Sequence, residues 1–322
     1  MIRSFLFLTL LVVSKSLSAE PVAELGEFSA FPKIDLEELA KGKVVTARSP
    51  AMSNARHLSV QACYIVEAPL SKTVELLKHW DAVRHPQLKV YLQGSVSLKP
   101  GVDNFTKIAT APANFIEASQ KMEPNHFQIG ASEAQKFSGV EGEAAIGAVW
   151  SKLLAQRATA FVSGGLAKQA PYENGQVRAS AEAATMLGEQ SKIRARFAGL
   201  IAGTPLGGGG ITPSLYWDMF EVEGDAHVSL GALYGRANAG GWQGVDINYF
   251  ATGGFFVHLT FFEFWPVQIG NSAATLVWRG DLLSSASLAS LRGVERSGAG
   301  TVMMRQLQKG AALFQKDASG ER

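Results

Sequence analysis

Residues 255–266, FFVHLTFFEFWP, decide how the fold of this chain is interpreted. A membrane helix needs about 20 consecutive apolar residues, whereas this run carries His258 and Glu263 and ends at a proline. In a strand, alternate residues face opposite sides, and both sides here are largely apolar. We therefore expect a strand covered on both faces, whose aromatic side chains either fill a core or form the wall of a cavity for an apolar ligand.

The sequence around this run predicts a largely antiparallel sheet. Runs of apolar or alternating residues separated by short Gly, Asn and Asp connections are typical of a meander. Such runs occur at 215–222, 227–234, 245–250, 255–265 and 274–281. Earlier in the chain, the pattern predicts strands at 58–67, 90–98 and 105–109, and a helix at 71–80.

Two other parts of the chain are predicted to be helical. Residues 115–201 are rich in Ala, Glu, Gln and Lys, and the segment GTPLGGGGITP at 203–213 ends them. This segment lacks the Lys and Ser/Thr that a phosphate-binding loop needs after its last glycine, so we interpret it as a flexible connection. Near the C-terminus, Met303, Leu307, Gly310 and Phe314 recur at helical spacing and predict an amphipathic helix facing the sheet.

Composition excludes some classes of protein. The chain has 322 residues, of which 47% are hydrophobic and 18% charged, with a formal net charge of +2. This is enough apolar material for a large core, and the nearly balanced charge argues against nucleic-acid binding, which needs a concentrated basic face. The single cysteine, Cys63, cannot form an internal disulfide and is expected to be a small buried apolar residue.

The N-terminus has the pattern of a signal peptide. Arg3 precedes an apolar run at 5–13, FLFLTLLVV, and small residues lead up to Ala19. This run is too short for an ordinary membrane span. We expect cleavage after Ala19 and export to the periplasm or the exterior, with an uncleaved anchor as the alternative.

Two passages give the chain a resemblance to a known family. They are VQACYIVEAPLSKTVELLKHWD at 60–81 and TLVWRGDLLSSASLASLRGVERSGAGTVMMRQLQKGAALFQKD at 275–317, together about a fifth of the chain. The order of strand, short helix, strands, meander and long last helix resembles the START-like (SRPBCC, Bet v 1-like) superfamily. The resemblance implies an α+β helix-grip fold, in which a curved antiparallel sheet surrounds a long C-terminal helix.

The same resemblance sets the expected domain boundaries. We expect a signal peptide at 1–19, an N-terminal arm at 20–55, a START-like domain at 56–316 and a polar tail at 317–322. Within the arm, residues 20–35 are expected to be extended, and LEELAKGK at 36–43 fits one or two helical turns. The helical segment at about 111–210 is additional to the length that the family implies.

Members of this superfamily mostly bind lipids, sterols or polyketides between the sheet and the last helix. The resemblance therefore implies an exported protein that binds or transfers a lipid or another hydrophobic small molecule, with transient membrane contact and no cofactor. Two alternatives remain open. One is an enzyme on the same scaffold, such as a cyclase or hydrolase, and the other is a structural or partner-binding protein with a filled core. No catalytic residue carries over from the family, and a binding role is favoured.

Candidate ligand-binding residues come from the aromatic strand, the next strand and the last helix. Arg279 and Asp281 share a strand face with Val277 and could orient a polar head group, or form a salt bridge at the end of the strand. His258 and Glu263 have opposite parity, so one strand cannot point both into one site. The full set is Phe255, Val257, His258, Leu259, Phe261, Glu263, Val277, Arg279, Asp281, Met303 and Leu307.

Other catalytic and metal chemistry finds little support in the sequence. His79 and His85 do not have a strong metal-ligand spacing, so no metal site is expected. No G-x-S-x-G nucleophile motif or dinucleotide fingerprint occurs. Asp218 and Asp246 lie on separate predicted strands, and the sequence leaves open whether they form a carboxylate pair for acid–base chemistry.

Overall fold

The computed structural model describes residues 21–122, 126–172 and 176–320. The expected signal peptide therefore lies outside the described residues. The strands are β1 (Val45–Arg48), β2 (His57–Val66), β3 (Val90–Val96), β4 (Ser214–Val222), β5 (Asp225–Asn238), β6 (Gly241–Ala251), β7 (Val257–Ile269) and β8 (Ser272–Ser284). The helices are α1 (Pro21–Phe28), α2 (Leu36–Ala40), α3 (Leu70–Lys78), α4 (Ala113–Lys121), α5 (Ala131–Ala134), α6 (Glu143–Gly164), α7 (Ala179–Glu189), α8 (Ser191–Arg196), α9 (Ala198–Ala202), α10 (Ala286–Ser290) and α11 (Gly293–Ser319). Five short 3-10 helices complete them: η1 (Ala82–Arg84), η2 (Pro86–Leu88), η3 (Val102–Thr110), η4 (Gln135–Phe137) and η5 (Gly165–Lys168).

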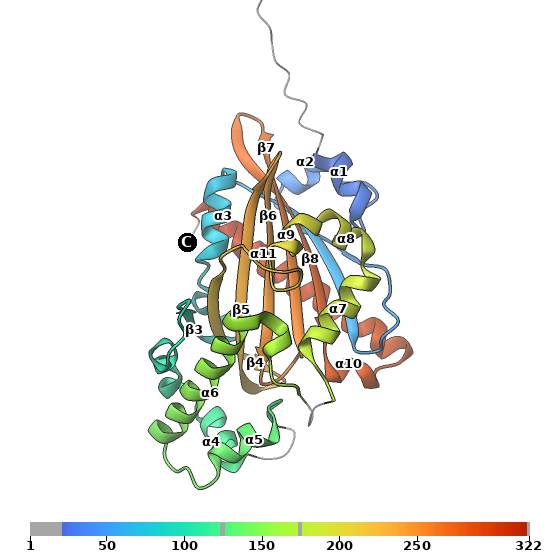
Figure 1. The fold of residues 1–322 in the computed structure, drawn as a ribbon. Coiled ribbons are helices and arrows are strands. Elements are labelled where there is room, and N and C mark those ends of the chain that lie inside the picture. The colour runs from blue at the N-terminus through green and yellow to red at the C-terminus, as the bar shows by residue number, and fades with distance from the viewer. Residues whose placement is uncertain (1–20, 123–125, 173–175, 321–322) are drawn as a thin grey trace, which may run out of the picture.

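All eight strands form one curved antiparallel sheet in the order β1-β2-β8-β7-β6-β5-β4-β3 (Figure 1). Strands β4 to β8 follow one another as the expected meander, and β2 pairs with β8 along its whole length. With the long C-terminal helix α11, this layout is consistent with a helix-grip arrangement. No helix among the described residues is long and apolar enough to cross a membrane.

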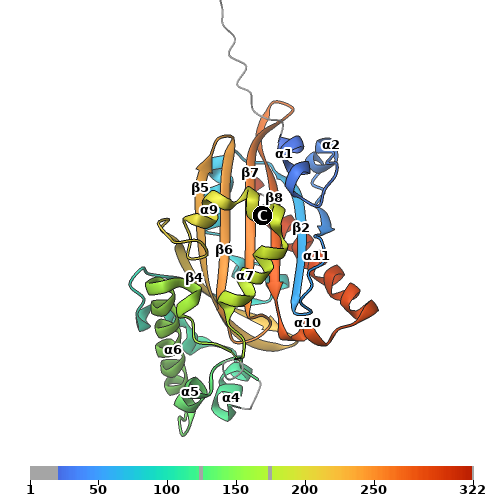
Figure 2. The same ribbon diagram turned by 45° about the vertical axis from the view of Figure 1, so that its right-hand side comes forward.

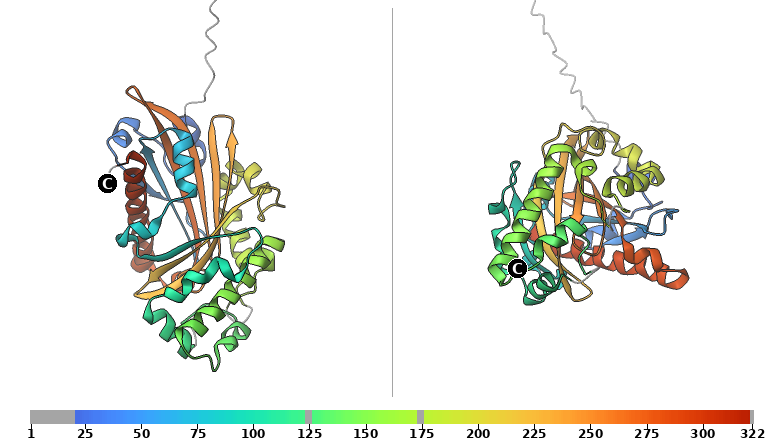
Figure 3. Two further views of the ribbon diagram at one scale, coloured as in Figure 1. Left: turned by 90° about the vertical axis from the view of Figure 1, so that its left-hand side faces the viewer. Right: turned by 60° about the horizontal axis from the view of Figure 1, so that its bottom comes forward.

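Helices cover the two faces of the sheet separately. Helices α7, α8 and α9 lie on one face and α11 on the other (Figures 1 and 2), and the curvature of the sheet between them is clear in Figure 3. We call the side on which α11 and α3 pack the α11 face, and the other side the opposite face. Each face has its own apolar cluster, and β7 contributes Phe262 and Phe264 to the α11 face and Leu259 and Phe261 to the opposite face. The aromatic run is therefore a strand whose two faces are both covered.

The packing of α11 confirms its predicted orientation. Leu307 and Phe314 are buried in the cluster of the α11 face, and Met303 packs at its margin. The helix also continues beyond the expected start of the polar tail at 317, because Asp317 accepts hydrogen bonds from Trp80 Nε1 and pairs with His85 Nε2, both at 2.8 Å. Because α11 ends at Ser319, the first three residues of the expected tail belong to the helix.

Two expected local structures are also wrong. The expected extended segment at 20–35 contains α1, because α1 buries Leu25 and Phe28, and Phe28 packs edge-on against Trp278 with ring centroids 4.8 Å apart. The helical turn expected at 36–43 is confirmed by α2. The expected strand at 105–109 is part of η3 instead. Phe105 and Ile108 are three residues apart and both buried, a spacing that suits a 3-10 helix better than a strand.

Candidate functional site

Polar side chains of four strands gather on the α11 face. Because side chains alternate along a strand, these polar side chains lie on the same side of the sheet as Phe262 and Val277. The strand register places Thr260 between Asp246 and Asp281, and His258 between Asn248 and Leu283. We call the set the polar face, and its members are Tyr216 and Asp218 on β4, Asp246 and Asn248 on β6, His258 and Thr260 on β7, and Arg279 and Asp281 on β8.

A glycine on β5 allows the two halves of the polar face to meet. Gly231 lies between Tyr216 on β4 and Asn248 on β6. A Cβ at Gly231 would lie 2.2 Å from the ring of Tyr216, so only glycine lets this ring lie across β5. The Tyr216 hydroxyl then reaches β6, where it donates a hydrogen bond to Asp246 Oδ2 at 2.6 Å and accepts one from Asn248 Nδ2 at 3.1 Å.

Solvent reaches much of the polar face. Asp218, Asp246, His258 and Arg279 are half-buried, although neighbouring residues of the same face are buried under α11 and α3. Asp281 and Thr260 form the buried floor. The polar face therefore lies where the helices stop covering the sheet.

Asp281 is the centre of an ion-pair network. Arg279 donates from Nε to Oδ2 at 2.8 Å and from Nη2 to Oδ1 at 2.7 Å, while His258 Nε2 lies 2.8 Å from Oδ1. Burial would raise the pKa of Asp281, but the charge of Arg279 and the hydrogen bond from His258 outweigh it and hold this pKa well below its usual range. Asp281 is thus a fully partnered carboxylate, and the expected salt bridge between Arg279 and Asp281 is confirmed.

Asp218 and Asp246 are in a different state. Asp246 Oδ1 is buried and has no hydrogen-bond partner among the described residues. Burial, followed by the nearby charge of Asp246, raises the pKa of Asp218 from 3.8 to about 7. Burial likewise raises the pKa of Asp246, against the hydrogen bond from Tyr216. Asp218 can therefore gain or lose a proton near neutral pH. Neither carboxyl group forms an ion pair with a described cation, so both offer free acceptors.

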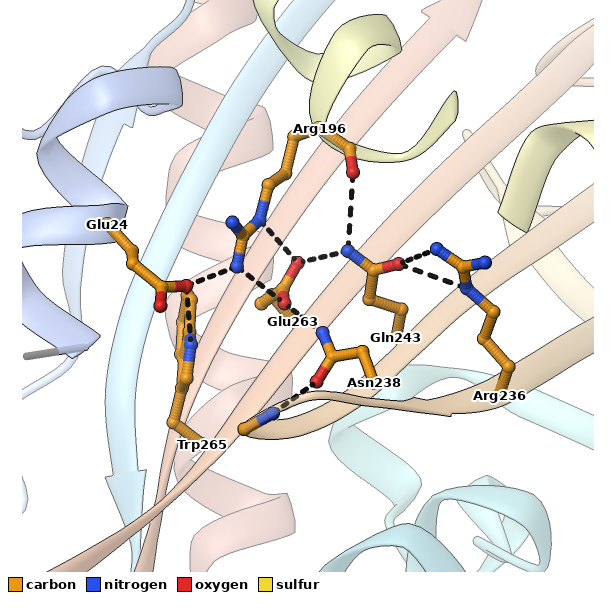
Figure 4. A network of polar contacts seen from close by, with 8 residues as sticks. Glu24, Arg196, Arg236, Asn238, Gln243, Glu263 and Trp265 are labelled. Carbon is orange, nitrogen blue, oxygen red and sulfur yellow. Dashed lines mark hydrogen bonds and ion pairs between the residues drawn. The ribbon is translucent and has the colours of Figure 1, made fainter. Parts of the chain in front are cut away.

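Several candidate residues from the sequence lie elsewhere. Val257, Leu259, Phe261 and Glu263 face the opposite side of the sheet. Buried Glu263 accepts hydrogen bonds there from Arg196, Asn238 and Gln243 at 2.7–3.2 Å (Figure 4). Its parity, read from the sequence, correctly separated it from His258.

The remaining candidates lie on or beside the α11 face. Val277 and Leu307 are buried between the sheet and α11, with Met303 half-buried at the margin. Phe255 precedes β7 and stacks on Phe220, and its ring edge meets His258 at a centroid distance of 5.9 Å. The sequence analysis missed Tyr216 and Asn248, although each is two residues from an aspartate that it had singled out and so shares that aspartate's strand face.

The other residues considered as catalytic or metal-binding candidates lie apart from the polar face. Cys63 is buried on the opposite face, and burial raises the pKa of its thiol. His79 pairs with Glu75, whereas His85 pairs with Asp317. Within the described ranges, no group of three or more His, Cys, Asp or Glu side chains is placed to hold a metal ion.

Comparison with known proteins does not add a family to this geometry. No family model, no curated protein and no solved structure matches the chain.

The raised pKa of Asp218 predicts a specific dependence of stability on pH. Between its ordinary pKa of 3.8 and its native pKa of about 7, the native state binds more protons than the unfolded state, so the free energy of unfolding decreases as pH rises. Asp218→Asn removes this loss. We expect the variant to be more stable than the parent at pH 8, by about 1–3 kcal/mol, and the difference to shrink toward pH 4 in thermal unfolding.

Asp281→Asn provides a control of opposite sign. The pKa of Asp281 is depressed, so its carboxylate stabilises the native state above its unfolded pKa, and this contribution is lost as pH falls. Asp281→Asn should therefore destabilise the protein at pH 8. If Asp218→Asn and Asp281→Asn change the stability in the same direction between pH 4 and pH 8, the pKa values of the two carboxyl groups are not shifted in opposite directions.

Proposed function

We propose that the protein is exported and binds a lipid or another hydrophobic small molecule on the α11 face, with its polar head group at Asp218 and Asp246. One observation carries the proposal: two carboxyl groups with raised pKa values, one with an unpartnered buried oxygen, lie half-buried on the α11 face beside its apolar cluster. Buried polar groups without partners are uncommon in proteins, so a ligand that donates hydrogen bonds would satisfy them.

Apolar side chains next to the polar face supply contacts for the body of the ligand. Leu233 lies opposite Asp246, and Leu283 lies opposite His258 with Leu58 beyond it. All three are half-buried, as are Phe220 and Met304. Covering them would contribute about 25 cal/mol per Å² of apolar surface removed from water.

Export and membrane contact belong to the same proposal. The pattern at residues 1–19 supports export, and a protein that transfers a lipid must meet a membrane transiently to load or release it. Neither step requires a cofactor.

A second function, acid–base catalysis, is favoured by one observation. Asp218, Asp246 and His258 lie on the same face, and a carboxyl group with a pKa of about 7 suits a general acid or base near neutral pH. Glu263, the fourth acid–base candidate, is on the opposite face. Catalysis predicts that a bound molecule is chemically changed during incubation, whereas a carrier releases it unaltered.

Native mass spectrometry of the purified protein tests the binding function. We expect a co-purified molecule with a hydrophobic body, which extraction would identify. Asp246→Asn should lower its occupancy about 10-fold, because a hydrogen bond to a charged group contributes about 1.5–3 kcal/mol. Asp225→Asn, the same change at an exposed turn of the same sheet, should not.

Two results would count against the proposal. One is a protein that carries no ligand and binds no fluorescent lipid, and the other is unchanged occupancy in Asp246→Asn. The same spectrum gives the mass of the mature chain, which should begin at Glu20. A full-length chain starting at Met1 would contradict cleavage after Ala19.

A further inference from the structure

We infer a second ligand site on the opposite face, in a pocket of about 360 Å³ between the C-terminal end of α6 and the glycine-rich segment 207–210. We propose that it takes a small, uncharged and largely apolar molecule with one hydrogen-bonding oxygen, such as a phenol or a ketone. Its volume lies within the range of about 300–1,000 Å³ that is typical of ligand pockets. The residues that decide its chemistry are Leu98, Phe161, Val162, Pro205, Ile211 and Tyr234.

The first support is the hydroxyl group of Tyr234. This side chain lines the pocket and is only 3% exposed as a whole. Its hydroxyl group forms no hydrogen bond with a described residue and is not fully buried, so it remains open to the pocket. Burial raises its pKa, so the group remains a neutral O–H at physiological pH. A ligand oxygen in the pocket would accept the hydrogen bond that this hydroxyl otherwise donates to solvent.

The second support is the apolar rim. Leu98 and Val162 line the same pocket, and they are 50% and 43% exposed. They belong to a small group of large apolar side chains that are this exposed in the described part of the chain. Inside the rim, Phe161 is held rigidly because its ring stacks on Tyr249 at a centroid distance of 3.8 Å. A ligand in the pocket would cover the rim and contact this fixed aromatic wall.

The glycine-rich segment excludes a charged ligand. The N–H groups of Gly207, Gly208 and Gly209 all donate to the carbonyl oxygen of Thr204, so they are not free to bind a phosphate. Gly208, Gly209 and Gly210 have φ angles of +137°, +93° and +125°, a backbone conformation that favours glycine. No Asp, Glu, Lys or Arg lines the pocket among the described residues, which leaves an uncharged molecule as the fitting occupant.

Ligand-detected NMR titration with 2-naphthol tests the site, with naphthalene-2-sulfonate as the charged comparison. We expect saturable binding of 2-naphthol and none of the sulfonate. Tyr234→Phe keeps the ring and should weaken binding of 2-naphthol about 5–10-fold, as expected for one hydrogen bond. Leu98→Trp, at the exposed rim, should leave thermal stability unchanged and block the pocket.

Asp246→Asn serves as the matched control, because it alters the α11 face and should leave binding of 2-naphthol unchanged. The result for this second site is therefore independent of the result for the proposed function. Equal affinity in the parent, Tyr234→Phe and Leu98→Trp would overturn the inference, and so would the absence of saturable binding to the parent protein.

Discussion

Leu307→Asp should prevent the chain from folding. Leu307 is 6% exposed on α11 and packs into the cluster formed with β2, β7 and β8. Removing a buried leucine costs about 2–5 kcal/mol, and the new carboxylate would be buried without a partner. The sum is comparable to the whole stability of a typical domain, about 5–15 kcal/mol. We expect loss of soluble protein, or a far-ultraviolet circular dichroism spectrum without a cooperative thermal transition.

Val302→Asp is the matched control on the same helix. Val302 is 57% exposed, so the same new charge remains in water and should change stability by less than about 0.5 kcal/mol. A soluble Leu307→Asp protein with unchanged thermal stability would show that α11 does not pack on the sheet, and it would remove the basis for the ligand-binding face proposed there.

Arg196→Met should have the next largest effect, on the opposite face. Arg196 on α8 donates two hydrogen bonds to buried Glu263, and it also pairs with Glu24 on α1 (Figure 4). Removing one partner of a buried ion pair costs about 3–5 kcal/mol because the other charge is left uncompensated. We expect a loss of this size in denaturant unfolding, and faster proteolysis near α1 because that helix loses its tie to α8.

A second substitution separates the charge effect from lost packing. In Arg196→Met/Glu263→Gln the buried charge is gone, while Asn238 and Gln243 can still hydrogen-bond the new side chain. We expect this double variant to recover more than half of the lost stability. Arg236→Met is the control, since Arg236 bonds only to Gln243 in the same network, and a loss as large as that of Arg196→Met would contradict the central role of Glu263.

Much of the sheet could be predicted because its signals are local. Alternating residues predicted the strands of the meander, and the same alternation assigned His258 and Glu263 to opposite faces, as the structure confirms. The period of the apolar residues from 303 to 314 correctly predicted which side of α11 packs on the sheet. These features follow from backbone geometry within a few residues, so tertiary context did not alter them.

The errors occurred where distant residues decide the local structure. The sequence predicts that residues 20–35 are extended, but α1 forms there because Phe28 packs against Trp278, 250 positions later in the chain. Similarly, η3 replaces an expected strand because Trp217 Nε1 donates to the carbonyl oxygen of Asn104, and Ser151 Oγ donates to that of Phe105. The sequence of residues 102–110 alone does not predict these hydrogen-bond partners.

The sequence by itself determined strands β2 to β8, the last helix and the parity of each candidate residue, because strand and helix periods are properties of short segments. Only the tertiary structure decided which of these residues meet. Asp218 and Asp246 share the polar face because the pairing of β4 and β6 with β5 brings their sides of the sheet together. Tyr216 reaches Asp246 because Gly231 on β5 leaves room for its ring. The pocket at Tyr234 likewise depends on α6 and the segment 207–210 meeting at β5. These contacts between distant residues depend on which strands pair and which helices cover the sheet. Strand pairing and helix packing are determined by the whole chain rather than by any one segment.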